Sequence, residues 1–243
     1  MIYTPTLTFV IDPKYDEEMI LQMCRSTVHS DINTVARNAS IDCEDVQRLL
    51  NADESHARKI ASSLVRNRYS LLDDKLIITR DLYQRSWNEI NNKFFGSVAQ
   101  IMEHGWEYQK YECVVSAFHR GISNWNGNII GRIWSENPYF MLKVTGHELI
   151  LAQTFALFRI DETLRRLNLD DRQKWEIGEM AAWCMTGLDN KLITLWPWLT
   201  KAQLFPKNHN YQALVNNQVN LASIYSNYGF KNFLARAIEI TNQ

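Results

Sequence analysis

Two adjacent residues, His147 and Glu148, have the side chains of this chain that are best suited to chemistry. On a helix, an imidazole can ligate a metal ion while a neighbouring carboxylate activates a metal-bound water as general base. A second histidine four residues later would share the helix face of His147 and complete an H-E-x-x-H pattern. The chain has Leu151 there, and an isobutyl group cannot ligate a metal. The pattern therefore indicates either a metal site that has lost a ligand or an incidental pair.

The elements that must position this pair follow from the spacing of apolar and turn-forming residues around it. In chain order, the pattern predicts a strand, a turn-rich segment, a second strand and two helices, over residues 111–118, 121–127, 128–134, 140–167 and 170–185. The first of the two helices contains His147 and Glu148, and Asp170 is placed to cap the second. Glu179 lies on that second helix, close to small alanines that would allow the two helices to approach each other.

This order of elements resembles that of the zincin-like metallopeptidases of the gluzincin type, over residues 110–187. In that family an edge strand lies along the substrate cleft just before the motif helix, and a Glu on the following helix supplies the third zinc ligand. The resemblance implies that His147 and Glu179 are the metal ligands of this chain. It also implies that Glu148 would be the catalytic base if any hydrolysis occurs.

The resemblance does not establish whether this chain binds a zinc ion. A catalytic zinc ion normally takes three protein ligands and a water molecule, and with Leu151 in the second histidine position only His147 and Glu179 remain. We therefore expect zinc to bind weakly or not at all. His119, at the end of the first strand of this half, is a remote candidate for a replacement ligand. Gln153 is not, because its position is rotated by about 120° from His147 around the helix axis.

The segment that joins the two strands carries more polar side chains than a plain hairpin needs. It contains the candidate ligand-binding residues His119, Arg120, Asn124, Trp125 and Asn128. Arg120 offers a planar fork of donors suited to a carboxylate or phosphate, and Trp125 could stack on a ligand. Asparagine and glycine also fill turns for conformational reasons alone. We interpret this loop as the rim of a cleft if the cleft exists.

The first part of the chain favours a short strand followed by helices and a hairpin. The expected elements are a strand at 6–11, helices at 16–28, 31–38, 42–50 and 54–67, a hairpin at 70–78 around Asp73-Asp74, and a long helix at 81–104. The pair of short helices has a helix-turn-helix rhythm, with the hairpin as a candidate wing. Asp42, Glu44 and Asp45 lie where phosphate contacts would need basic residues, so nucleic acid is an unlikely partner.

Composition places the whole chain among globular proteins. It has 243 residues, 46% of them hydrophobic, a net charge of −1 and four scattered cysteines, which suits reduced thiols in the cytoplasm. No signal-peptide pattern and no long apolar run is present, so we expect no secretion and no membrane span. The fold class expected is α+β, mainly α-helical, with a small β-sheet, an N-terminal helical region at 1–86 and a zincin-like domain at 87–243. Two further helices, at 210–225 and 228–240, are expected to finish the chain.

These observations favour binding over catalysis. We expect a peptide or protein segment to bind along residues 128–134 by β-augmentation. Three alternatives stay open: an active zinc metallopeptidase with a rearranged site, a helix-turn-helix DNA-binding regulator, and a helical scaffold protein. A purely structural role for His147 and Glu148 is the simplest reading of the pair.

Overall fold

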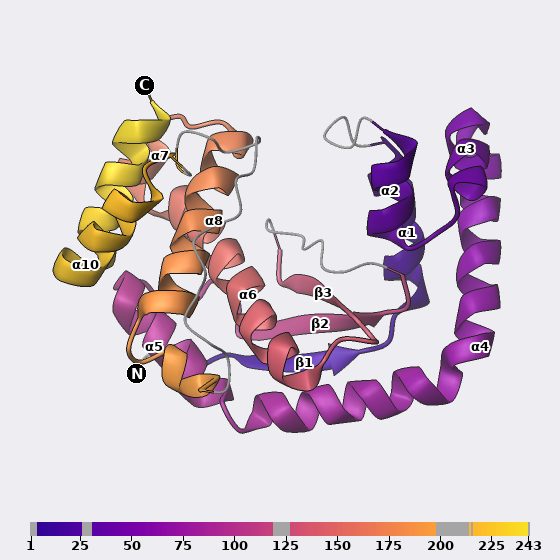
Figure 1. Cartoon of the computed structure of the whole chain (residues 1–243), viewed down its shortest axis with the longest axis horizontal. Coiled ribbons are helices and arrows are strands. Elements are labelled where there is room, and N and C mark those ends of the chain that lie inside the picture. Colours follow the sequence, from indigo (N-terminus) through magenta and orange to yellow (C-terminus); the bar gives the residue numbers. More distant parts are fainter. Residues whose placement is uncertain (1–3, 26–30, 119–126, 198–213, 215, 243) are drawn as a thin grey trace.

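The computed structural model describes residues 4–25, 31–118, 127–197, 214 and 216–242. The protein is a mainly α-helical α+β fold with one small sheet (Figure 1). Its elements are β1 (Thr6–Val10), α1 (Pro13–Arg25), α2 (Ile32–Ala39), α3 (Cys43–Asn51), α4 (Glu54–Asn88), α5 (Asn91–Met102), β2 (Lys110–Ser116), β3 (Ile129–Ile133), α6 (Pro138–Ile160), α7 (Glu162–Arg165), α8 (Asp171–Leu188), the 3-10 helix η1 (Ile193–Leu195) and α10 (Gln218–Thr241).

The sheet has the order β1-β2-β3, and both strand pairs are parallel. Glu112 of β2 stands opposite Thr8 of β1 and Ile129 of β3. All three strands lie where the sequence places them, to within two residues at each end. The connection between β2 and β3 is not a hairpin, because a hairpin would make the two strands antiparallel.

Helices gather at both ends of the sheet (Figure 1). α1, α2, α3 and the beginning of α4 lie at one end, and α5, α6, α8 and α10 lie at the other. α4 bends and runs on beneath the sheet, where it contacts β1. The domain boundary expected after residue 86 falls inside α4, and β1 shares its sheet with β2 and β3. In the described part of the chain, no helix combines the length and apolarity that crossing a membrane requires.

The expected hairpin at residues 70–78 is wrong, because this segment is part of the 35-residue helix α4. The buried residues Val65, Leu76, Tyr83 and Trp87 recur along α4 at spacings of a helix face, so packing of that face decides the conformation. Asp73 and Asp74 are exposed, where two acids do not interrupt a helix. The helix-turn-helix alternative thereby loses its candidate wing.

Other differences concern where helices begin and end. The long helix expected at 81–104 is two helices, because α4 ends at Asn88 and α5 begins at Asn91. The helix that carries His147 ends at Ile160 rather than at 167, and Asp161 caps the short α7 that follows. Asp170 caps α8 as expected, in a reciprocal capping box with Gln173. The described part of the two expected C-terminal helices is α10, in which two helical segments meet at Gly229, whose φ of +80° is not helical; the break between the two helices therefore lies at residue 229 rather than at 226–227.

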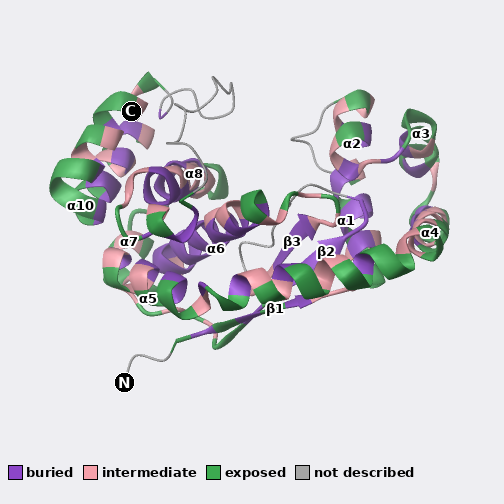
Figure 2. Cartoon of the chain, turned by 60° about the horizontal axis from the view of Figure 1, so that its bottom comes forward, coloured by how far each residue is buried: buried purple, intermediate pink, exposed green. Residues whose placement is uncertain are grey.

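α6 is the central helix of the fold (Figure 2). From Met141 to Phe158 its residues are buried, with the exception of Lys143, Val144 and His147. These three lie one and four positions apart and therefore share one face of the helix. A helix that is buried on nearly every side gives these side chains a rigid support.

Candidate functional site

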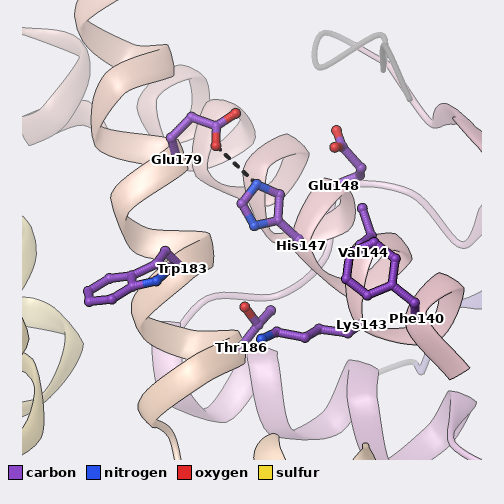
Figure 3. Close-up of a pocket in the computed structure, with 8 residues that line it drawn as sticks. All are labelled: Phe140, Lys143, Val144, His147, Glu148, Glu179, Trp183 and Thr186. Atoms are coloured by element: carbon purple, nitrogen blue, oxygen red, sulfur yellow. Dashed lines mark hydrogen bonds and ion pairs between the residues drawn. The ribbon is translucent and has the colours of Figure 1, made fainter. Parts of the chain in front are cut away.

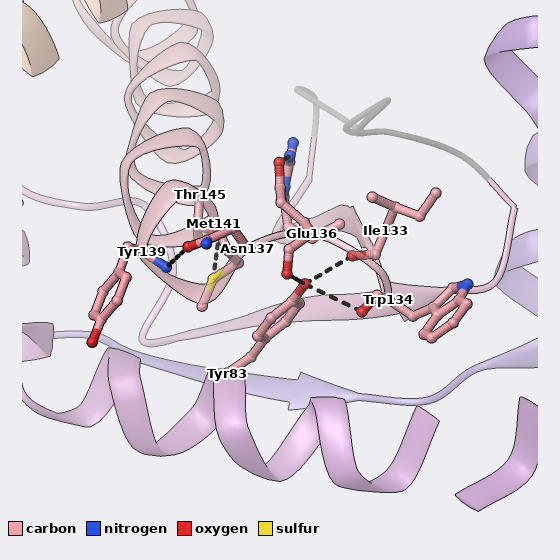
Figure 4. Close-up of polar contacts among 9 residues, drawn as sticks. Tyr83, Ile133, Trp134, Glu136, Asn137, Tyr139, Met141 and Thr145 are labelled. Atoms are coloured by element: carbon pink, nitrogen blue, oxygen red, sulfur yellow. Dashed lines mark hydrogen bonds and ion pairs between the residues drawn. The ribbon is translucent and has the colours of Figure 1, made fainter. Parts of the chain in front are cut away.

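The first turn of α6 is fixed by α4 and by its own cap (Figure 4). The Tyr83 hydroxyl of α4 lies 3.0 Å from the Ile133 carbonyl and 2.8 Å from the Glu136 carbonyl, within donating distance of both. Asn137 is the N-cap, and its side chain accepts a hydrogen bond from the Tyr139 amide at 2.9 Å. The chain from β3 into α6 is therefore tied to a buried tyrosine of the long helix.

Two glycines set the depth at which α6 packs. A Cβ atom added at Gly146 would lie 3.0 Å from Phe94 of α5, and one added at Gly178 of α8 would lie only 2.4 Å from Leu151 Cδ1. The two helices run antiparallel, since Leu151 meets Gly178 while His147 meets Glu179. The two helices pack tightly at Leu151 and Gly178, and a pocket opens between them toward the beginning of α6.

A pocket of about 380 Å³ lies where the two helices separate (Figure 3). Five residues of α6 and three of α8 line it: Phe140, Lys143, Val144, His147, Glu148, Glu179, Trp183 and Thr186. Every residue of α6 between Met141 and Phe158 that is not buried is therefore a pocket residue. The three residues of this helix face that are not buried are therefore accessible from the pocket between α6 and α8.

At one end of the pocket, His147 and Glu179 form an ion pair between α6 and α8. His147 Nε2 lies 3.1 Å from Glu179 Oε2, and their side chains are 20% and 16% exposed. Burial acts to lower the pKa of His147, but the charges of Glu179 and Glu148 and the hydrogen bond that His147 donates to Glu179 outweigh it, so the pKa is raised. Arg132 of β3 opposes this effect. The pair is thus favoured in its charged form, with a positive imidazole beside a carboxylate.

Glu148 connects this pocket to the polar residues beneath it. Its side chain lines the pocket although the residue is buried. The charge of Glu148 contributes to raising the pKa values of Tyr15 on α1 and Cys113 on β2, for both of which burial is the main cause. Arg132, also buried, forms an ion pair with Glu136. Glu148 is therefore part of the pocket wall and is also close enough to the interior groups of Tyr15 and Cys113 to affect their pKa values.

The other end of the pocket holds Lys143 and Thr186 (Figure 3). Lys143 is partly buried, and desolvation lowers the pKa of its ammonium. No hydrogen bond or ion pair connects Lys143 to any residue in the described ranges. The Thr186 residue is only 2% exposed, and its hydroxyl likewise has no partner in the described part of the chain. Lys143 and Thr186 are therefore two donors of the pocket that bond to no other described residue.

The structure brings His147, Glu148 and Glu179 to one pocket, as the arrangement expected from the sequence requires. Leu151 is not at the pocket, because its side chain packs on Gly178. Gln153 lies on another face of α6, where its amide donates to the Gly105 carbonyl at 2.9 Å. The described residues contain no group of three His, Cys, Asp or Glu side chains that could hold a metal ion.

The predicted loop residues do not join the described pocket. Asn128 lies just before β3, where its amide donates to the Lys110 carbonyl at 2.9 Å, and it does not line the pocket. The other four, His119, Arg120, Asn124 and Trp125, lie outside the described residues. Sequence reasoning missed the other five lining residues: Phe140, Lys143, Val144, Trp183 and Thr186. For Lys143 a signal exists, because it precedes His147 by four residues and so shares its helix face.

A second polar cluster lies at the ends of β1 and β2 and is closed. Asp16 of α1, expected as a helix cap, is fully buried within the first turns of the helix. Its carboxylate accepts hydrogen bonds from the Ser116 hydroxyl, the Ala117 amide at 2.9 Å and the Tyr69 hydroxyl at 2.9 Å. Burial raises the pKa of Asp16 to about 6, although these hydrogen bonds lower it. The cluster joins α1, α4 and β2.

No protein-family model matches this chain, and neither the curated proteins nor the solved structures contain one that is significantly similar to it.

Proposed function

We propose that this protein is a binding module for a peptide or protein segment, and that the pocket between α6 and α8 receives part of that segment. The observation that carries the proposal is the composition of the pocket. Aromatic side chains, Phe140 and Trp183, stand beside charged side chains of both signs in a cavity of about 380 Å³. Pockets that combine apolar walls with a few convergent polar groups are typical ligand sites.

The rim of the pocket supports a macromolecular ligand. Tyr139 and Phe140 at the start of α6 are 57% and 48% exposed, and Phe140 also lines the pocket. Exposed aromatic residues are enriched at protein interfaces. A segment lying across this rim could place one residue inside the pocket.

We place the contact at the pocket rather than along β3. Ile130, Gly131 and Arg132, the middle of that edge strand, are buried. Glycine has no side chain, so burial of Gly131 means that the strand backbone itself is covered. An added strand needs accessible backbone groups at the sheet edge, which makes β-augmentation the weaker form of the binding hypothesis.

Hydrolysis is not part of the proposal. His147 and Glu179 bond directly to each other, and a donor set of two described side chains does not fit a catalytic zinc ion with three protein ligands. The zincin-like kinship stays a proposal, supported by the succession β3, α6, α8 and by the pairing of residues 147 and 179. Zinc analysis of the purified protein after dialysis tests it, and we expect no stoichiometric metal.

The binding proposal is tested with random peptide libraries of eight residues, one presented with free carboxy termini and one with free amino termini, and fluorescence polarisation of the peptides that are recovered. We expect Phe140→Ala to weaken binding about tenfold or more, since aromatic residues at interfaces often contribute more than 1 kcal/mol. Tyr228→Ala is the matched control, because Tyr228 is an exposed aromatic of α10 that does not line the pocket. Recovery of no binder from either library contradicts the proposal.

One observation favours the helical scaffold as a second candidate. Leu71, Ile78 and Leu82 on α4 are 79%, 66% and 41% exposed, and their spacing of seven and four residues places them on one helix face. Such a stripe would fit a partner helix. Light scattering coupled to size-exclusion chromatography tests this: a scaffold elutes as an oligomer that Ile78→Ser dissociates, whereas a monomer at every concentration excludes self-assembly through this stripe.

We propose that the protein acts in the cytoplasm. The four cysteines Cys24, Cys43, Cys113 and Cys184 are all free thiols, which is typical of a reducing compartment. Nucleic acid stays an unlikely partner, because Glu44 and Asp45 of α3 are acidic where a reading helix would need basic residues.

A further inference from the structure

The end of the pocket at Lys143 and Thr186 has donors without acceptors. Lys143 carries a positive charge in a partly buried position, and Thr186 places a hydroxyl in a nearly inaccessible one. Neither group bonds to another residue within the described ranges. Both donors line the pocket, where water can solvate them, and a ligand whose acceptors replace that water gains the free energy of the new hydrogen bonds.

The opposite end of the pocket is already balanced. His147 is paired with Glu179 across the two helices, and Glu148 lies among polar groups of the interior. The charge that lacks a counter-ion among the described pocket residues is therefore that of Lys143, and the missing partner is an anion.

We propose that Lys143 and Thr186 bind the free carboxy-terminal carboxylate of a peptide, whose last side chain is apolar and packs against Phe140, Val144 and Trp183. This inference rests on the proposed function and names the part of the peptide that enters the pocket. The carboxylate accepts from the Lys143 ammonium and from the Thr186 hydroxyl. The apolar side chains that line the same pocket take the last side chain of the peptide.

The charges of the pocket favour a carboxylate over a phosphate. Glu148 and Glu179 line the same cavity, and their negative charges repel a dianion more strongly than a monoanion. Lys143 is the only lysine or arginine among the eight lining residues, whereas phosphate sites commonly use the bidentate fork of arginine. A monoanion with two oxygen acceptors matches one ammonium and one hydroxyl.

The size of the pocket favours a chain end over the middle of a peptide. A cavity of about 380 Å³ lies toward the lower limit of ligand pockets, which span roughly 300–1,000 Å³. A chain end needs room for one residue, whereas an internal segment must enter and leave the cavity. An acidic side chain inside the pocket would satisfy Lys143 but leave the apolar walls without a contact.

The test uses eight-residue peptides recovered from the library with free carboxy termini, each resynthesised as the free acid and as the carboxy-terminal amide. Affinity for the native protein is measured by calorimetry. We expect amidation to weaken binding about 10- to 100-fold, because a hydrogen-bonded ionic contact of this kind is lost. Lys143→Met should weaken binding of the acid to a similar extent and leave binding of the amide nearly unchanged.

Matched variants separate this role from a structural one. Lys143→Arg, which keeps the charge, should retain most of the affinity, and Thr186→Val, which removes only the hydroxyl, should lose about 3- to 10-fold. Lys59→Met is the control, because Lys59 is exposed on α4 and lies outside the pocket. Urea unfolding of each variant verifies that the fold is intact.

Two outcomes overturn the inference while leaving the proposed function in place. In the first, binding depends on Phe140 but responds neither to amidation nor to Lys143→Met. In the second, binding is insensitive to amidation and is lost when an Asp or Glu of the peptide becomes Asn or Gln, which assigns Lys143 to an acidic side chain. Absence of any peptide binding overturns the proposed function itself, so the two failures are distinguishable.

Discussion

Asp16 and Lys143 are both ionisable residues of helices, but their surroundings differ. Three donors from α4, β2 and the residue that follows it surround the Asp16 carboxylate, and the residue is fully buried. Lys143 borders an open cavity and has no partner in the described ranges. The first arrangement is complete without a ligand, and we propose that a ligand completes the second.

The comparison distinguishes two kinds of polar group in the fold: those that are fully hydrogen-bonded within the protein, and those that line a pocket without a partner among the described residues. A satisfied cluster contributes to the uniqueness of the fold, since each donor specifies one neighbour. An unsatisfied group in a pocket costs stability and is retained where a ligand can supply the partner. Burial and pKa shifts occur at both places, so the hydrogen-bond inventory, and not the degree of burial, distinguishes a structural site from a binding site.

The largest effect on the closed cluster is expected from Asp16→Ala. The substitution leaves the Ala117 amide and two hydroxyls without their acceptor and opens a cavity, so the free energy of unfolding at about pH 5 should fall by about 3 kcal/mol. Asp16→Asn is the control. Its amide can still accept from Ala117 and Tyr69 and donate to Ser116, so a loss of about 1 kcal/mol or less is expected in urea titrations. Equal losses would contradict a role for the acceptor.

The pH dependence of stability tests the same cluster. The pKa of Asp16 is about 6 in the folded protein and 3.8 when unperturbed, so between these values the folded state holds a proton that the unfolded state has lost. The free energy of unfolding should therefore fall as pH rises from about 4 to about 6, by on the order of 2–3 kcal/mol for this group. Urea unfolding of the native protein and of Asp16→Asn at each pH measures this, and the variant should lack this component.

A parallel decline of both proteins over this pH range would assign it to other groups. Above about pH 7, where native Asp16 carries its buried charge, Asp16→Asn should be at least as stable as the native protein. A variant that is clearly less stable there would show that the carboxylate is better solvated than its burial indicates.

The helix contact beside the pocket is tested with Gly178→Ala. The new methyl group would lie 2.4 Å from Leu151 Cδ1, so the helices must separate or Leu151 must change rotamer, at a cost of about 1–3 kcal/mol. Leu151→Ala in the same chain should recover part of that loss, and a double-mutant cycle measures the coupling. Additive effects would mean that the two residues are not in contact.

The smallest effect on metal content is expected from restoring the missing histidine. Leu151→His completes the H-E-x-x-H pattern, but the side chain at this position lies in the contact with Gly178 and not at the pocket. We therefore expect no stoichiometric zinc by elemental analysis after dialysis, and some loss of stability from the buried imidazole. One zinc ion per chain would instead support the metallopeptidase kinship and a site that needs only this ligand.

Local patterns in the sequence predicted much of the fold. β-branched runs identify β1, β2 and β3, and Asp170 with Gln173 marks the beginning of α8. The expectation that His147 and Glu179 lie together on neighbouring helices came from the resemblance to the zincin-like metallopeptidases, and the two side chains are 3.1 Å apart. These features depend on residues close in sequence, or on two helices that follow each other along the chain.

Long-range packing decided the rest. Asp73-Asp74 favours a turn within residues 70–78, but packing of the buried face of α4, to which Leu76 and Tyr83 belong, outweighs this local preference. From the sequence alone Asp16 is predicted to be a helix cap. In the structure its carboxylate accepts hydrogen bonds from Ser116 and Ala117, which lie about 100 residues later in the chain. The sequence alone determined the three strands, most of the helices and the residue types that could do chemistry. Only the tertiary structure decided which polar groups are satisfied, because a hydrogen-bond partner from a distant segment leaves no local signal.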